Sequence, residues 1–393
     1  MKVLSGLDVV ERKQFENLFG KNIGLLCHQA SVNQRYIHII DLLLPLHKNN
    51  KLRIKGIFGP QHGLWGYTQE NMIEWEGYQD LRTGLMIYSL YGQTRKPSQN
   101  MLTDIDIFVV DLQDIGARYY TFIWTMALLF ESCAEQEIPV MVLDRINPIN
   151  GSQIDGTLLD MNYRSFVGYL PLTMRHGMTI GEIAKYFQEE FYSDLHLQVV
   201  RLENWNRMFY FPDTGSPWVM PSPNIPHWES CLVYPGMCLL EGTNLSEGRG
   251  TTRPFEIFGA PWIDGWMLAS RMNQLKLPGI YFRPLQFLPT FHKYKDEICE
   301  GAFLHITDRM SFKPVLTAVA LLGEICRLYP HHFKWKNPPY EFEYEKMPFD
   351  ILAGNMWLRE YIINYKPLRE IQEKMDQELR EFKRIAENYT IYE

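Results

Sequence analysis

The chain has 393 residues, 46% of them hydrophobic and 14% aromatic, so it is long enough for two or perhaps three domains with a large packed core. Its 39 basic and 46 acidic residues give a formal net charge of −7, and no lysine or arginine run stands out, so charge gives no support for binding to nucleic acid or to an anionic membrane. No stretch of about 18 apolar residues occurs, which argues against a membrane-spanning helix.

The N-terminus and the cysteines indicate where the protein works. The first twenty residues contain an early lysine but no long apolar stretch and no small-residue cleavage site, so we do not expect a secretory signal. The cysteines lie mostly in apolar surroundings and form no C-x-x-C pair, which predicts buried thiols rather than a zinc site or a disulfide framework. We therefore expect a cytoplasmic protein without a bound metal.

Runs rich in isoleucine and valine, each short enough for a buried strand, recur along the first half of the chain. They lie at residues 23–27, 53–58, 106–112, 139–144 and 197–202. Amphipathic stretches predict helices between them, at residues 36–48, 120–136 and 179–192. The last of these opens with capping-box spacing between Thr179 and Glu182. Strands that alternate with helices predict an α/β fold with a mostly parallel sheet flanked by helices.

Each of the first four strand-like runs ends in a polar cluster. The clusters contain His28 with Gln29, Gln61 with His62, Asp111 with Gln113 and Asp114, and Asp144 with Arg145. Because ligands of open α/β sheets collect at the carboxyl ends of the strands, the four clusters predict one shared crevice. Any single cluster could instead cap a helix or form a turn.

The second half of the chain begins with a proline-rich connection. Residues 211–226 contain five prolines, which predicts an extended segment without regular helix or central strand. Beyond it we expect a strand at residues 303–307 and helices at 315–328 and about 367–386. This part is typical of a smaller α+β domain.

Residues 241–256, EGTNLSEGRGTTRPFE, are unusually polar for a protein with so many hydrophobic residues. Arg249 and Arg253 can form forked bonds to a carboxylate or phosphate. Glu241 and Glu247 can supply the acid, base or nucleophile that hydrolysis needs. A ligand explains the segment more easily than packing does, although a solvated polar loop is the alternative.

Several motifs that indicate a cofactor, a metal or a serine nucleophile are absent from the sequence. The sequence contains neither G-x-G-x-x-G nor a P-loop, and neither H-E-x-x-H nor G-x-S-x-G, so we expect no cofactor. Asp111, Gln113 and Asp114 could hold a cation, but further carboxylates are missing nearby and we expect no metal.

Carboxylates and arginines in predicted loops are the stronger theme. Glycoside hydrolysis usually needs two carboxyl groups across the scissile bond. The candidate carboxylates are Glu70, Asp111, Asp114, Glu241 and Glu247, and the candidate arginines for an acidic substrate are Arg118, Arg175, Arg249 and Arg253. Structural ion pairs among the same residues are the alternative interpretation.

Several long strings of the sequence resemble those of the NamZ-type exo-β-N-acetylmuramidases, a family of bacterial peptidoglycan-recycling glycoside hydrolases. They are GIFGPQHGLWG (56–66), LYGQTRKPS (90–98), VVDLQDIGARYYTF (109–122), LDRINPING (143–151), PLTMRHGMTIGE (171–182), VYPGMCLLEGTNLSEGRGTTRPFEIFGAPWID (233–264) and HITDRMSFKP (305–314). These strings spread over nearly the whole chain, and strings of this length are specific.

The resemblance implies a Rossmann-like N-terminal domain, which we place at residues 1–225, and a smaller α+β C-terminal domain at residues 226–393. A solvent-open cleft is expected near their junction, with residues 226–264 contributing to it. The implied activity is release of N-acetylmuramic acid from the non-reducing ends of peptidoglycan fragments. The expected partner is therefore a sugar or muropeptide, and its lactyl carboxylate explains why the cleft would hold arginines.

Two positions of one loop depart from the family: Trp65 stands where the family usually has arginine, and the other change, at the strand-end motif, matters more. The strand-end motif is usually G-P-E-H-G, and its glutamate is the leading candidate for the catalytic acid, whereas this chain has Gln61. An amide cannot donate a proton as a carboxylic acid does. Either Glu70, Glu241 or Glu247 performs the proton transfer, or the chain is a catalytically impaired carbohydrate-binding homologue. A hydrolase of a different acidic glycoside is the third possibility.

Our leading hypothesis is a muramidase-type glycosidase in which Glu241 and Glu247 are the catalytic carboxylates and Gln61 and His62 orient the sugar. Glu70 and Asp111 are the further catalytic candidates. The candidate substrate-binding residues, drawn from the matched strings, are Trp65, Arg118, Tyr119, Arg175, His176, Asn244, Arg249 and Arg253.

Overall fold

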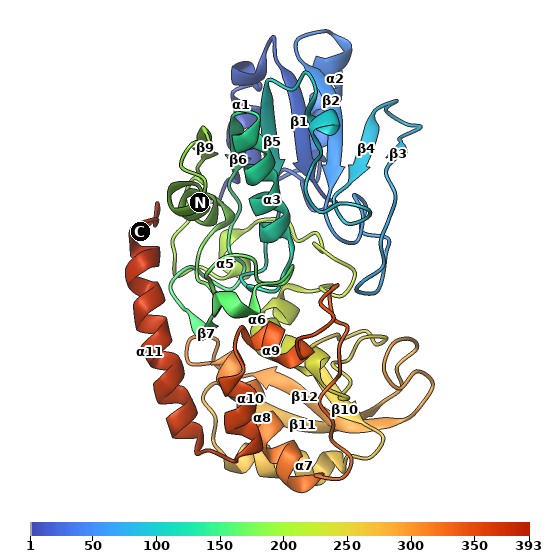
Figure 1. Ribbon diagram of the computed structural model, residues 1–393, viewed down its shortest axis with the longest axis vertical. Helices are drawn as coiled ribbons and strands as arrows, with labels where there is room; N and C mark the ends of the chain where they lie inside the picture. The colour runs from blue at the N-terminus through green and yellow to red at the C-terminus, as the bar shows by residue number, and fades with distance from the viewer. Residues whose placement is uncertain (1) are drawn as a thin grey trace.

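The computed structural model describes residues 2–393 and forms two bodies, one above the other in Figure 1. The upper body is built on a seven-stranded sheet and the lower body on a three-stranded antiparallel sheet. The arrows of the central strands in the upper body point down toward the lower body, so the carboxyl ends of these strands face the junction (Figure 1).

The large sheet has the strand order β3-β4-β2-β1-β5-β6-β9, and only β3 runs antiparallel to its neighbour. The strands are β1 (Asn22–Cys27), β2 (Arg53–Gly59), β3 (Tyr78–Gln79), β4 (Met86–Ser89), β5 (Ile107–Asp111), β6 (Val140–Leu143) and β9 (Leu197–Val200). Counted along the chain, the parallel strands follow the Rossmann order 3-2-1-4-5-6. The predicted α/β fold with a mostly parallel sheet is therefore confirmed.

The predicted helices of the upper body form where the apolar periodicity placed them. They are α2 (Ile39–Lys48), α3 (Phe122–Glu135) and α4 (Ile180–Phe191). The short α1 (Gly6–Arg12) was not predicted. The capping box of α4 is confirmed, because the Thr179 side chain accepts from the Glu182 N–H and the Glu182 carboxylate accepts from the Thr179 N–H.

The lower body holds β10 (Ile257–Ala260), β12 (Cys299–Ile306) and β11 (Ile280–Phe287), which neighbour one another in that order. Its helices are α6 (Trp228–Met237), α7 (Gly265–Gln274), α8 (Pro314–Leu328), α9 (Pro348–Ala353) and α10 (Trp357–Ile363). The strand predicted at residues 303–307 is the second half of β12. The sequence did not predict β11, since Arg283 and Pro284 interrupt its apolar pattern.

The proline-rich connection contains one turn of helix that the sequence prediction excluded. Helix α5 (Phe211–Thr214) begins the segment, with Pro212 in its first turn. A proline is tolerated there because the N–H groups of the first turn have no partner within the helix. The expectation of no regular helix was therefore wrong for these four residues.

The C-terminal helix α11 (Leu368–Glu387) runs from the lower body along one side of the molecule toward the upper body (Figure 1). It packs against β7 (Asp155–Leu158), which pairs with β8 (Thr173–Arg175), and the carboxylate of Glu378 accepts from the N–H of Leu158 at 3.0 Å. One buried apolar cluster includes residues of both bodies and of α11. The two bodies are therefore joined by a continuous core, and the boundary at residues 225 and 226 stays a prediction.

Within residues 2–393, every helix is either too short or too polar to cross a bilayer.

Candidate active site

A pocket lies where the carboxyl ends of β2 and β5 meet segments of the second half of the chain. Its lining comprises Gln61, His62, Asn71, Tyr119, Tyr120, Thr121, Phe122, Val167, Ser222, Asn224, Ile225, Tyr234, Arg249, Phe255, Tyr340 and Glu341. This edge of a Rossmann sheet is where ligands ordinarily bind. We call this cavity the junction pocket. Of the four predicted strand-end clusters only Gln61 and His62 line it, where they meet Arg249 of the polar segment, so the prediction of one crevice shared by all four clusters was wrong.

Gln61 and His62 both line the junction pocket, directly after β2. The Gln61 amide accepts a hydrogen bond from the Thr121 hydroxyl at 2.7 Å and directs its Nε2 toward a carboxylate oxygen of Glu341 at 3.5 Å. Burial lowers the pKa of His62 to about 4. With the Thr68 carbonyl 2.8 Å from Nδ1, the neutral imidazole donates from that atom and leaves Nε2 as a hydrogen-bond acceptor.

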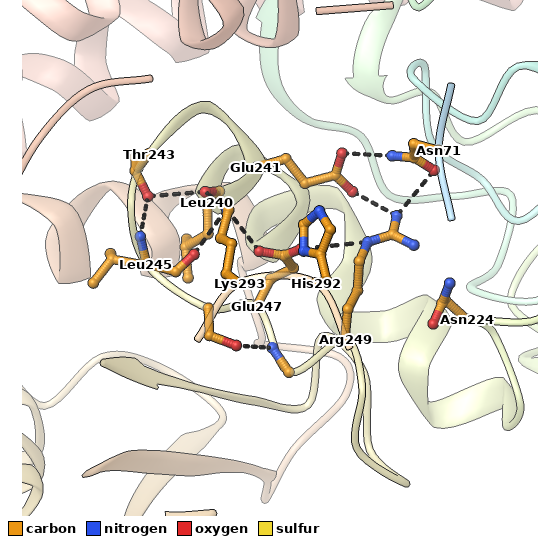
Figure 2. A network of polar contacts seen from close by, with 12 residues as sticks. Asn71, Asn224, Leu240, Glu241, Thr243, Leu245, Glu247, Arg249, His292 and Lys293 are labelled. Atoms are coloured by element: carbon orange, nitrogen blue, oxygen red, sulfur yellow. Dashed lines mark hydrogen bonds and ion pairs between the residues drawn. The ribbon is translucent and has the colours of Figure 1, made fainter. Parts of the chain in front are cut away.

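The polar segment is buried from residue 241 to 250 except for the half-buried Asn244, so the alternative of a solvated loop is wrong for these residues. Arg249 is 5% exposed and lines the junction pocket, and its Nη2 donates to Glu241 at 2.7 Å (Figure 2). Glu241 also accepts from the Asn71 amide at 2.8 Å and the Tyr340 hydroxyl at 2.6 Å. Glu241 therefore lies behind Arg249, Asn71 and Tyr340, which themselves form part of the pocket wall.

Glu247 is fully buried and surrounded by positive and hydrogen-bonding partners (Figure 2). Lys293 Nζ lies 2.9 Å from its carboxylate, and Arg249 Nε and His292 Nδ1 each lie 3.3 Å away. Burial alone would raise the pKa of Glu247, but these three partners outweigh it and hold the pKa well below its usual range. A carboxylate held charged in this way is a poor proton donor, which favours the structural ion-pair interpretation of this residue.

Asp111 ends β5 and is also fully buried, but it does not line the junction pocket. Both of its carboxylate oxygens accept from the Arg145 guanidinium, one of them at 2.8 Å. The pair joins the carboxyl ends of β5 and β6. The geometry supports a structural role here, against the expected catalytic one.

Three of the predicted substrate-binding residues are buried and bonded to other groups of the protein in place of a ligand. Arg118 is completely buried and donates to the carbonyls of Thr157, Leu172 and Leu352. Arg175 donates to a backbone carbonyl, and His176 Nε2 lies 3.1 Å from Asp114. Arg175 and His176 line a separate cavity beside α11, away from the junction pocket.

Five other predicted residues divide between the pocket and the periphery. Tyr119 lines the junction pocket and hydrogen-bonds the Pro235 carbonyl. Trp65, Glu70, Asn244 and Arg253 are absent from its lining. The ring of Trp65 lies against the ring of His38, and Asn244 hydrogen-bonds the backbone of residues 332 and 334. Arg253 forms an ion pair with Glu256 at 3.2 Å. Glu70 is partly exposed and lies in the loop after the second strand-end cluster.

Sequence reasoning missed the pocket residues that come from outside the quoted strings. Asn71, Asn224, Tyr340 and Glu341 all line the pocket, and Tyr91 hydrogen-bonds Glu341 at 2.7 Å. The signal for Glu341 was the segment PPYEFEYEK at 338–346, in which carboxylates and aromatics follow two prolines. Nothing in the sequence indicated that it would meet β2 across 280 positions.

The comparisons with known proteins agree along the whole chain. Two family models match it, "Exo-beta-N-acetylmuramidase NamZ, N-terminal" over residues 23–229 and "Exo-beta-N-acetylmuramidase NamZ, C-terminal" over residues 232–392. The chain is 42% identical over 391 residues to the peptidoglycan β-N-acetylmuramidase NamZ of Bacillus subtilis (strain 168), covering 100% of this chain and 92% of that protein.

Two crystal structures of DUF1343 family proteins from Bacteroides fragilis NCTC 9343 have the same fold. One superposes with a TM-score of 0.89 at 33% identity and the other with 0.76 at 28%, and each pairing covers 100% of this chain and 99% of the other. On this evidence the chain belongs to the NamZ family of exo-β-N-acetylmuramidases.

Proposed function

We propose that this protein is an exo-β-N-acetylmuramidase, a glycosidase that releases N-acetylmuramic acid from the non-reducing ends of peptidoglycan fragments. The observation that carries the proposal is a family match over the whole chain in a structure whose Rossmann edge holds one small pocket with a carboxyl group, an arginine and several aromatic rings.

Arg249 is the group we assign to the lactyl carboxylate of the substrate. Its Nη2 is bonded to Glu241, whereas its Nη1 is buried without a hydrogen-bond partner among the described residues. A buried, unpaired guanidinium nitrogen costs free energy until an acceptor arrives, so this atom favours an anionic ligand. The surrounding carboxylates fix the guanidinium plane in place before the sugar binds.

The walls of the pocket supply the other contacts that a pyranose ring needs. Tyr120, Phe122, Tyr234 and Phe255 offer apolar ring faces to the sugar C–H groups. His62 Nε2 is placed to accept from a sugar hydroxyl or from the N–H of the acetamido group. In this assignment Gln61 and His62 orient the sugar, as the sequence led us to expect.

The direct test is release of N-acetylmuramic acid from a synthetic MurNAc–GlcNAc disaccharide by the purified, folded protein. A GlcNAc–GlcNAc disaccharide, which lacks the lactyl carboxylate, is the matched control and should be a much poorer substrate. If neither disaccharide is cleaved, calorimetry with MurNAc–GlcNAc shows whether the protein binds the sugar without hydrolysing it. Binding without product would establish the impaired carbohydrate-binding homologue and overturn the enzyme.

We also propose that the protein works in a reducing compartment, the cytoplasm. The cysteines of the described chain are all buried thiols without a disulfide. Fractionation of cells that express the tagged protein tests the proposal, and recovery outside the cytoplasmic fraction would contradict it.

A further inference from the structure

We propose that Glu341 is the general acid that protonates the glycosidic oxygen in this protein. The inference rests on the muramidase function proposed above and adds the residue that performs its proton transfer. Glu341 comes from a turn between α8 and α9, far along the chain from the strand-end clusters.

Glu341 is the carboxyl group that the junction pocket itself presents. Among the lining residues of the described chain it alone carries a carboxylate, since Glu241 and Glu247 lie behind the wall. Glycoside hydrolysis requires a proton donor at the leaving oxygen, and neither the Gln61 amide nor the neutral His62 is suited to that task. The position of Glu341 therefore matches a requirement of the reaction that the other pocket residues leave unmet.

The carboxyl group is held in place by two neighbours. One oxygen accepts from the Tyr91 hydroxyl at 2.7 Å, and the other lies 3.5 Å from Gln61 Nε2. The Arg95 guanidinium stacks on the Tyr91 ring, 4.1 Å from its centroid, and so supports the hydroxyl that bonds the acid. A proton donor in a glycosidase must be oriented in this way before the sugar arrives.

The backbone beneath Glu341 adopts a conformation that its residue types do not favour. Tyr340 and Glu343 exchange two backbone hydrogen bonds of 2.9 Å across a two-residue turn, and the residues between them, Glu341 and Phe342, have φ values of 46° and 65°. Turns with two positive φ values are ordinarily built from Asn-Gly or similar pairs. Strain of this kind is retained when the surroundings enforce it, and it concentrates at functional sites.

The local environment also keeps a proton on Glu341 near neutral pH. Burial raises the pKa of its carboxyl group to about 7; the charge of Glu241 acts in the same direction, and the bonds from Tyr91 and Gln61 oppose it. A glycosidase acid needs such a raised pKa to remain protonated at the pH of the reaction. The ionisable groups that face Glu341 are Glu241, Tyr91, Arg95, Lys336 and Tyr340.

The proposed proton transfer fits the overall hydrolysis of the glycosidic bond. The Glu341 O–H protonates the oxygen that joins C1 of the terminal sugar to the next residue, and the C1–O bond breaks with its electron pair remaining on that oxygen. The leaving sugar departs as an alcohol and Glu341 becomes a carboxylate. Water adds to C1 and loses one proton, which returns to Glu341 through solvent, so the net change is the addition of one water molecule.

The test compares Glu341→Gln with the wild type on two substrates that differ in their need for an acid. For the MurNAc–GlcNAc disaccharide, whose leaving alcohol is a weak acid, we expect kcat to fall about 10²- to 10⁴-fold. For the 4-nitrophenyl β-glycoside of N-acetylmuramic acid, whose leaving phenolate needs little protonation, we expect a loss smaller than tenfold. The matched control is Glu345→Gln, an exposed glutamate of the same segment, which should leave both rates unchanged.

The outcomes separate this inference from the proposed function. A wild type that cleaves neither substrate overturns the muramidase itself. A wild type that is active, with a variant that loses nothing or loses equally on both substrates, overturns only the role of Glu341. If the variant does not fold, the wild-type pH profile decides: kcat/KM for the disaccharide should fall above about pH 7, and the aryl glycoside should lack this fall. Identical profiles for the two substrates would overturn the inference.

Discussion

Glu247 provides the sharpest test of whether the buried carboxylates behind the pocket stabilise the fold or take part in catalysis. Glu247→Gln keeps the shape of the side chain but removes the charge that faces Lys293 and Arg249. Removing one partner of a buried ion pair typically costs about 3–5 kcal/mol. In the variant Lys293 still donates to the Leu240 and Leu245 carbonyls at 3.0 and 2.8 Å, and Arg249 still pairs with Glu241. We therefore expect the free energy of unfolding to fall by about 3 kcal/mol, the low end of that range.

Thermal unfolding makes that loss measurable. An unfolding entropy of about 2.1 cal/mol/K per residue amounts to about 0.8 kcal/mol/K for a chain of 393 residues, so Tm should fall by about 4 °C. The control is Glu203→Gln, which breaks an exposed ion pair with Arg12 and should shift Tm far less. We expect the activity of the folded Glu247 variant to stay within a few-fold of wild type. An unchanged Tm with a loss of rate above a hundredfold would refute the structural role and restore the catalytic one.

The pH dependence of stability gives an independent check on the same residue. The folded pKa of Glu247 is depressed below its usual value near 4.5, so its contribution is fully present above that value and declines as pH falls toward the folded pKa. The difference in unfolding free energy between wild type and Glu247→Gln should therefore be constant from pH 8 to about pH 5 and narrow at lower pH. A difference that widened on acidification would contradict the assignment.

Further substitutions test the other assignments. Tyr91→Phe removes a hydrogen bond that favours the charged form of Glu341, so the alkaline limb of kcat/KM should move to higher pH; a shift to lower pH would contradict the contact. Arg249→Lys should raise KM for MurNAc–GlcNAc about tenfold, equivalent to about 1.4 kcal/mol, and should raise it far less for GlcNAc–GlcNAc. Arg145→Met should lower the unfolding free energy by about 3–5 kcal/mol and leave KM unchanged, because Arg145 pairs with the buried Asp111; a raised KM would place Asp111 in the site.

The sequence predicted the upper body well because its signals are local. Buried parallel strands appear as continuous apolar runs, and the helices between them carry caps and apolar periodicity that neighbouring residues decide. The runs at 53–58 and 106–112 became β2 and β5, and the Thr179 capping box opened α4. Exposed or interrupted strands such as β11 were missed, since their patterns depend on what packs against them.

The candidate site was predicted in part. The polar segment at 241–256 and the strand-end motif at Gln61 do meet at one pocket, but the other three strand-end clusters do not line it. Asp111 and Arg118 have the residue types of a sugar site, yet one is neutralised by Arg145 and the other holds three carbonyls. Residue type alone does not distinguish a ligand-binding charge from one whose partner lies elsewhere in the chain.

By itself the sequence determined the class of fold, the family and the edge of the sheet at which a ligand would bind, because apolar spacing and strand-end chemistry act over short stretches of chain. Only the tertiary structure decided which carboxylate faces the pocket. Glu241 and Glu247 are held in ion pairs with Arg249 and Lys293, whereas Glu341 comes from a distant turn and lies buried in the pocket wall with a hydrogen bond from the Tyr91 hydroxyl. A carboxyl group becomes an acid or a structural anion through its burial and its neighbours, and folding alone brings those neighbours together.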